Sequence, residues 1–196
     1  MTKHLQIDLD ELSKELLTMG AMVEEATNRA INDHENRIED HALKMLALHQ
    51  PVAADLRYII TVLKVNNDLE RIGDHAVSIA ERAVVLAGLE PVPRPEDFDL
   101  LVQTVQRMMK ESLTALIEHD AALARSVCEM DDEVDRVHRL MYSAMQTVMR
   151  NDVALIESAV NTISATRHLE RIGDLATNIA EDVVFMVEGE ILRHNY

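Results

Sequence analysis

Two pairs of acidic residues occupy the same positions in a repeated segment. DLERIGDHAVSIAER covers residues 68–82, and HLERIGDLATNIAED at 168–182 repeats it with ten of the fifteen positions identical. Within each copy a Glu and an Asp lie four residues apart, which on a helix brings like charges together at a cost of a few tenths of a kcal/mol. Carboxylates at this spacing can share a hard or borderline cation, so they are candidate metal ligands. The pairs are Glu70 with Asp74 and Glu170 with Asp174.

A glycine lies between the two acids of each pair. Gly73 and Gly173 each disfavour a helix by about 1 kcal/mol relative to Ala, so we predict that another group approaches the backbone closely there. On a helix of about 100° per residue, the acids form a stripe beside an apolar face. That face is predicted to be buried in the first copy, and it consists of Leu69, Ile72, Ala76, Ile79, Ala80 and Ala83.

A second helix should complete such a site, because one helix rarely supplies enough ligands. The segment DDEVDRVH at 131–138 places Asp131, Asp135 and His138 on one stripe. The two aspartates have the one-turn spacing of a ligand pair, whereas His138 is interpreted as a surface residue. In the first copy the residue aligned with Asp135 is Asn32, a poorer ligand, so the first site is predicted to be the less complete of the two.

The acidic stripes also fit a solvated surface on which Arg71 and Arg171 relieve the repulsion, and the residues alone leave both interpretations open. Other chemistry is sparse. The sequence has no Gly-rich phosphate loop, no C-x-x-C and no H-E-x-x-H. Asp135 and His138 only approximate the E-x-x-H signature of di-iron oxidases. We therefore expect no catalysis.

Composition favours a helical protein. Of 196 residues, 47% are apolar but only 3% are aromatic, and five glycines and four prolines leave few breaks between elements. The formal net charge is −16, which would repel a nucleic-acid backbone, so nucleic acid is excluded as the expected partner. The lone Cys128, the lack of a signal-peptide pattern and the shortness of the apolar runs predict a cytoplasmic protein with no transmembrane segment.

The helical periodicity predicts an all-α fold of two tandem three-helix units, residues 1–90 and 91–196. The boundary between them is GLEPVPRPED at 88–97, which holds three of the four prolines. Pro51 should interrupt the helical pattern, and Asn151 or Asp152 should cap the last helix. The predicted helices cover residues 8–31, 35–49, 53–87, 97–118, 120–149 and 152–187.

The two units differ in length. MVEEATNRAI at 22–31 resembles MMKESLTALI at 108–117 with an offset of 86 residues, whereas the acidic motif repeats with an offset of 100. If Asn32 matches Asp135, roughly 17 residues are absent after Ile31 in the first unit, by the logic of internal repeats. Either the first unit carries a true deletion or a disordered loop is missing from the sequence. We favour the missing loop, because a deletion would remove packing from two helices.

Together these motifs resemble the PhoU family. The resemblance rests on LERIGDHAVSIAE and LERIGDLATNIAE, each closing a three-helix unit, on HQPVAADLR between helices, and on TMGAMVEEA near the start. It covers essentially the whole chain apart from the short stretch after Ile31. The resemblance implies two three-helix bundles related by a pseudo-twofold axis and commonly assembled as a homodimer.

The resemblance also implies multinuclear iron or zinc sites on the bundle surface, held by facing pairs of acidic motifs. It implies no catalytic activity. Glu70 and Asp74 would serve one site, and the other would be formed by Asp131, Asp135, Glu170 and Asp174.

The function that the resemblance implies is regulation of phosphate uptake. PhoU-like proteins link the ATPase of the phosphate ABC transporter to a sensor histidine kinase, and they damp uptake and phosphate-starvation gene expression when phosphate is plentiful. Such a protein would associate peripherally with membrane complexes. Two alternatives stay open: a carboxylate-bridged metal-storage or di-metal redox protein, and a scaffold whose metals are adventitious.

Overall fold

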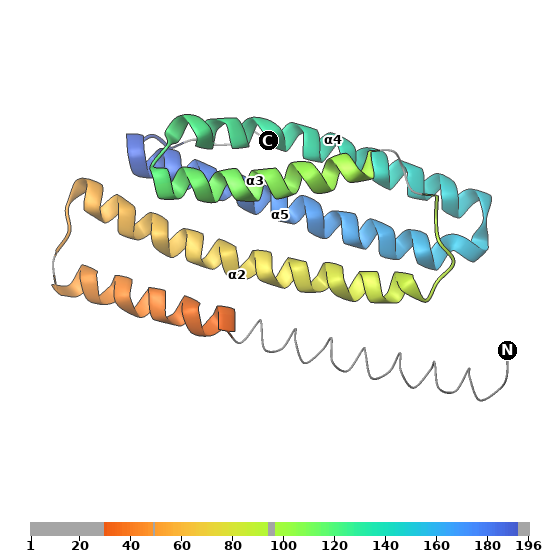
Figure 1. The fold of residues 1–196 in the computed structure, drawn as a ribbon, viewed down its shortest axis with the longest axis horizontal. Coiled ribbons are helices and arrows are strands. Elements are labelled where there is room, and N and C mark those ends of the chain that lie inside the picture. Colours follow the sequence, from red (N-terminus) through yellow and green to blue (C-terminus); the bar gives the residue numbers. More distant parts are fainter. Residues whose placement is uncertain (1–29, 49, 94–96, 192–196) are drawn as a thin grey trace.

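The structure, a computed structural model, describes residues 30–48, 50–93 and 97–191, and these are almost entirely helical (Figure 1). The predicted all-α class is confirmed, and no strand occurs among the described residues. The predicted first helix, residues 8–31, lies outside them except for its last two residues. The elements are a helix at residues 30–48, α2 (Ala53–Ala87), α3 (Phe98–Glu118), α4 (Ala121–Asn151), the 3₁₀ turn η1 (Val153–Leu155) and α5 (Ile156–Glu188).

Most helix boundaries agree with the sequence. The helix predicted at 53–87 is found at those residues, and Pro51 lies in the connection before it. The last predicted helix begins instead with η1, where the Asp152 carboxylate accepts a hydrogen bond from the Ala154 backbone N–H at 2.9 Å. This is the predicted capping role of Asp152, while Asn151 is the final residue of α4.

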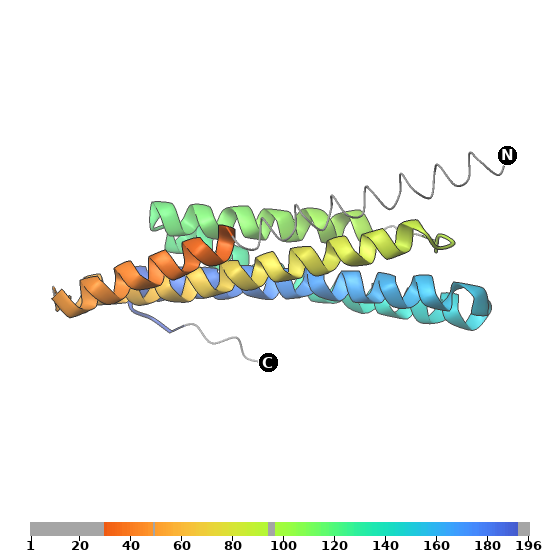
Figure 2. The same cartoon turned by 90° about the horizontal axis from the view of Figure 1, so that it is seen from below.

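Helix α5 lies at the centre of the arrangement. It packs with α3 and α4 in a three-helix bundle, and α2 runs antiparallel along its other side (Figures 1 and 2). The helix of residues 30–48 lies against the first half of α2 (Figure 1). The division into two three-helix units stays a prediction, because most of the first helix of the first unit is outside the described residues.

The core of the α3–α4–α5 bundle is made of small and flexible apolar side chains. Methionines fill it where other proteins use aromatic rings, as their adaptable shape allows. The largest fully buried side chains include Leu101, Met108, Met141, Met145, Leu175, Ile179, Val127, Val134 and Val137.

The two copies of the repeated motif are buried to different extents. In α5 the apolar face of the motif is buried, as Ile172, Ala176, Ile179, Ala180 and Val183 show. In α2 the prediction of a buried face is wrong for four residues. Helices α3 and α4 cover α5 but not α2, and no other described helix covers this part of α2. Ile72 and Ile79 do pack against the core. The four exposed residues are Leu69, Ala76, Ala80 and Ala83.

The predicted close approaches at the two glycines are confirmed. A Cβ on Gly173 would lie 3.3 Å from Val134 Cγ1 of α4 and 3.8 Å from Val105 Cγ2 of α3. A Cβ on Gly73 would lie 3.1 Å from Ile31 Cδ1. In each copy the glycine therefore lets a branched apolar side chain of a neighbouring helix approach the backbone.

These contacts also establish how the copies correspond. Ile31 takes the place beside Gly73 that Val134 takes beside Gly173, so Asn32 corresponds to Asp135, as the sequence alignment assumed. The helix of residues 30–48 is thus the counterpart of the second half of α4. It runs without a break through Ile31 and Asn32. The predicted end of a helix at Ile31 is therefore wrong, whereas the choice between a true deletion and a missing loop stays a prediction.

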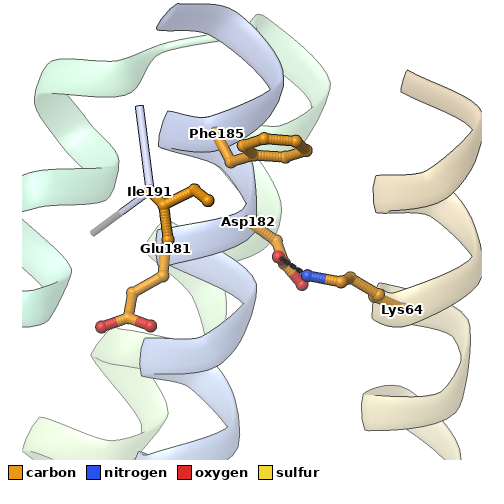
Figure 3. A pocket seen from close by; sticks show the side chains of 5 residues that line it. All are labelled: Lys64, Glu181, Asp182, Phe185 and Ile191. Atoms are coloured by element: carbon orange, nitrogen blue, oxygen red, sulfur yellow. Dashed lines mark hydrogen bonds and ion pairs between the residues drawn. The ribbon is translucent and has the colours of Figure 1, made fainter. Parts of the chain in front are cut away.

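Polar contacts join α2 to the C-terminal half of α5. The Thr61 hydroxyl donates to the Asp182 carbonyl at 3.2 Å, and Lys64 Nζ pairs with Asp182 Oδ1 at 2.6 Å (Figure 3). Phe185 and Ile191 lie above this ion pair and line a pocket of about 290 Å³ with it. The ion pair and the Thr61 hydrogen bond thus join α2 to the same residue of α5.

Two histidines meet farther along the same interface. The Nδ1 atoms of His75 in α2 and His168 in α5 lie 3.2 Å apart, with the ring centroids at 5.3 Å. Burial lowers the pKa of both rings, and for His75 the neighbouring His168 lowers it further. Both imidazoles are therefore neutral at pH 7.

The glycine contacts generate a contrasting pair of predictions. We expect Gly73→Ala to leave stability unchanged or raise it by up to about 1 kcal/mol, because alanine favours the helix and the Ile31 side-chain end can move. Gly173→Ala should destabilise by about 1–2 kcal/mol, because Val134 is fully buried and cannot yield without strain. Urea unfolding of both variants checks this, and equal effects of the two substitutions would contradict it.

Candidate metal site

Three of the predicted ligands converge between α4 and α5. Asp135, Glu170 and Asp174 each offer a carboxylate oxygen, and these oxygens all lie within 4.8 Å of one another. All three side chains are half-buried. The group combines a residue of one helix with a one-turn pair of the other, as the sequence predicted.

The glycine contact explains why these side chains meet. Asp135 follows Val134 in α4, and Asp174 follows Gly173 in α5. Where Val134 contacts the Gly173 position, the two helices approach closely, and the residues that follow are carried to the same edge of the interface. A larger residue in place of Gly173 would separate the two carboxylates.

Asp131 lies beside this group but is not one of the three converging ligands. One turn before Asp135 in α4, its Oδ1 accepts a hydrogen bond from the Thr177 hydroxyl of α5 at 3.2 Å. Its negative charge acts on both Glu170 and Asp174. Four of the six predicted residues therefore share one edge of α4 and α5.

The remaining pair lies apart on α2. Glu70 and Asp74 belong to no group of three potential ligands in the part of the chain that the structure describes. Burial raises the pKa of Glu70, and the charges of Asp74 and Glu35 raise it further while Arg71 lowers it. The sequence analysis missed Glu35, although it corresponds to His138 once Asn32 is aligned with Asp135.

The converging carboxylates repel one another. Burial raises the pKa of Glu170, against the lowering effect of Arg171, and Asp135 raises it further. Burial, followed by the charge of Glu170, raises the pKa of Asp174 to about 6. Arginines offset part of the charge, since Arg171 Nη1 lies 3.4 Å from Asp174 Oδ2 and Arg139 Nη1 lies 3.1 Å from Asp135 Oδ2.

One oxygen of the group lacks a normal hydrogen bond. Glu170 Oε2 is buried and has no hydrogen-bond partner among the described residues. The nearest cationic atom, Arg171 Nε, is 3.8 Å away, which is too far for a hydrogen bond. A buried carboxylate oxygen without a partner is costly, and a cation between the three carboxylates would supply one. The residues present therefore fit a hard or borderline metal ion.

His138 is closer to the site than expected. Its side chain is half-buried, so it is a surface residue partly covered by its neighbours. Burial lowers its pKa, and it lies within electrostatic range of Asp135 and Asp174, which act in the opposite direction. It does not belong to the converging group of Asp135, Glu170 and Asp174.

The family relationship accounts for the repeated acidic motif. A family model described as PhoU domain matches residues 10–83 and 98–183, which together contain both copies of the motif. The chain belongs to the PhoU family. Individual relatives can be aligned with nearly the whole chain.

Two curated relatives illustrate this similarity. The phosphate-specific transport system accessory protein PhoU homolog of Pseudomonas aeruginosa is 36% identical over 216 residues, covering 99% of this chain and 89% of the relative. The homolog of Clostridium acetobutylicum is 32% identical and covers 96% of each chain. The first alignment spans 216 positions against 196 residues here, so the relative contains residues that this chain lacks.

Solved structures of the family have the same fold. The crystal structure of PhoU from Pseudomonas aeruginosa matches with a TM-score of 0.81 at 36% identity, covering 94% of this chain and 99% of that one. The phosphate transport system regulatory protein PhoU from Streptococcus pneumoniae matches with a TM-score of 0.77 at 28% identity, covering 96% and 91%. None of the described helices here contains an apolar stretch that could span a bilayer.

The raised pKa of Asp174 predicts a stability that depends on pH. The folded protein binds the Asp174 proton more tightly than the unfolded chain, whose pKa is near 3.8. Asp174 therefore lowers stability as the pH rises from about 4 to about 6, and the loss is complete above that range. We expect Asp174→Asn to stabilise the metal-free protein at pH 7 by about 1 kcal/mol, because partial exposure screens the charge.

The measurement is urea unfolding in a chelator between pH 4 and 7.5. The gain in Asp174→Asn should disappear toward pH 4, while Asp132→Asn, at an exposed position of α4, should show no such gain. A variant that is less stable than the wild type at pH 7 would contradict the assignment of repulsion at Asp174.

Proposed function

We propose that this protein is a non-enzymatic accessory regulator of phosphate transport. The observation that carries the proposal is the match to the PhoU domain in both halves of the chain. It is supported by two relatives named as phosphate-specific transport system accessory proteins and by a related structure titled as a regulatory protein of phosphate transport.

In this proposal the protein works in the cytoplasm and binds two partners. One is the ATPase of a phosphate ABC transporter and the other is a sensor histidine kinase. When phosphate is plentiful, the protein would reduce both phosphate uptake and the expression of phosphate-starvation genes. The net charge of −16 supports docking to basic protein surfaces. The proposed assembly is a homodimer, and each chain contains two three-helix units. The dimer would associate peripherally with membrane complexes from the cytoplasmic side.

We also propose that the acidic side chains hold iron or zinc in multinuclear sites. Asp131, Asp135, Glu170 and Asp174 would hold one site, and Glu70 and Asp74 would contribute to a weaker one. The converging oxygens and the unpartnered Glu170 Oε2 support the first. When bound, the metal would neutralise the acidic charge and connect α4 to α5.

The three-carboxylate group supports a second candidate function, a carboxylate-bridged metal-storage or redox protein. Such proteins place His beside Glu in ligand register on two helices, whereas the described helices bring only His138 near the group. Ferrous-iron-dependent oxygen consumption by the purified protein would favour this second function over the regulatory one.

A genetic complementation experiment tests the regulatory function. In a Pseudomonas aeruginosa strain that lacks its own PhoU, we expect this chain to restore repression of a phosphate-starvation reporter in phosphate-rich medium. Glu170→Ala/Asp174→Ala should restore it less well if metal supports partner binding. Failure of the wild-type chain to restore repression, together with no binding to the purified transporter ATPase or kinase sensor region, would overturn the proposal.

Metal content tests the proposed site. Protein purified without added metal should contain iron or zinc by inductively coupled plasma mass spectrometry. Glu170→Ala/Asp174→Ala should lose most of it, because these residues supply two of the three converging ligands. The matched variant Glu70→Ala/Asp74→Ala should lose less. Equal metal content in the wild type and both variants would exclude these carboxylates as ligands.

A further inference from the structure

The His75–His168 pair is a feature that the acidic site does not explain. The two rings come from different helices, and their Nδ1 atoms lie 3.2 Å apart in the α2–α5 interface. The corresponding residues of the repeat are Leu175 and Asp68, so duplication of the motif does not account for the pair. Both side chains are half-buried, which leaves room for solvent or an ion to reach them.

The spacing of the nitrogens suits a shared metal ion. With Zn–N bonds of about 2.0–2.1 Å, tetrahedral coordination places two imidazole nitrogens about 3.3–3.4 Å apart. The observed 3.2 Å differs from this by about 0.1–0.2 Å. We propose that His75 and His168 form a two-histidine site for a borderline divalent metal ion such as Zn²⁺ that links α2 to α5. Imidazole is a preferred ligand for such ions.

Charges of both signs surround the pair. Asp74 acts on His75 and Glu81 acts on His168, so a carboxylate lies near each ring. Arginines act on both rings as well, and each of them lowers the pKa of its ring more than the nearby carboxylate raises it. Arg71 pairs with Asp68, Arg82 with Glu81, and Arg171 with Glu170 and Asp174. Arg167 is the further cationic residue that acts on His168.

This site is separate from the acidic one. His168 and Glu170 are two residues apart in α5, and on a helix such residues do not face the same way. His168 faces α2, whereas Glu170 faces Asp135 of α4. The two sites would therefore bind metal independently, and the two-histidine site would connect α2 to the α3–α4–α5 bundle.

Titration calorimetry with Zn²⁺ tests the proposal. The parent is the full chain with Glu170→Ala/Asp174→Ala, which removes the stronger acidic site, and we expect one equivalent of Zn²⁺ to bind it more tightly than any other. Adding His75→Gln or His168→Gln should weaken Zn²⁺ binding by at least about 10–100-fold. Substitution of a residue that only supports a metal ligand already reduces metal affinity by this factor. His138→Gln is the matched control and should have no effect. Unchanged Zn²⁺ affinity in both histidine variants would overturn the site.

A second measurement does not depend on how the histidine variants fold. Electron paramagnetic resonance of the same parent protein with one equivalent of Cu²⁺ should show coupling to two imidazole nitrogens. A spectrum with oxygen ligands alone would overturn the proposal and would indicate that the pair is only a hydrogen bond between neutral rings. Zn²⁺ should also raise the melting temperature of the parent, since it binds only the folded interface.

Discussion

The contact between Val134 of α4 and Gly173 of α5 is the packing constraint on which the candidate site depends. Without a side chain at Gly173, the two helices approach so closely that a Cβ there would lie only 3.3 Å from a methyl carbon of Val134. The next residue of each helix is an aspartate, so the same contact brings Asp135 to the Glu170–Asp174 pair. A helix-destabilising residue is thus retained where close packing and the acidic group coincide.

Helix α5 contacts α2, α3 and α4, so its position affects the packing of all three. It is covered on one side by α3 and α4 and on the other by α2, and its apolar residues are correspondingly buried. Helix α2 carries nearly the same motif, yet many of its apolar residues are exposed, because α3 and α4 cover α5 and no described helix takes their place over this part of α2. One sequence motif therefore has two levels of burial, and among the described residues only the second copy brings three potential metal ligands together.

The electrostatics of the second copy favour a bound cation over an empty acidic cluster. Burial and mutual repulsion raise the pKa values of Glu170 and Asp174, and a buried oxygen of Glu170 lacks a hydrogen bond among the described residues. Such an arrangement lowers the stability of the metal-free protein. In a family of transport regulators, it would let metal binding strengthen the α4–α5 interface, and the two-histidine site would act in the same way between α2 and α5.

The sequence by itself determined the helical class, most helix boundaries, the repeat and the residues of the acidic stripes, because these follow from local periodicity and turn chemistry. It also predicted that something would approach Gly73 and Gly173. Only the tertiary structure decided that the approaching groups are Ile31 and Val134, that one acidic pair gains a third ligand, and that His75 meets His168. These outcomes depend on which helices cover which faces, and helical periodicity cannot specify the register between helices that are distant in the chain.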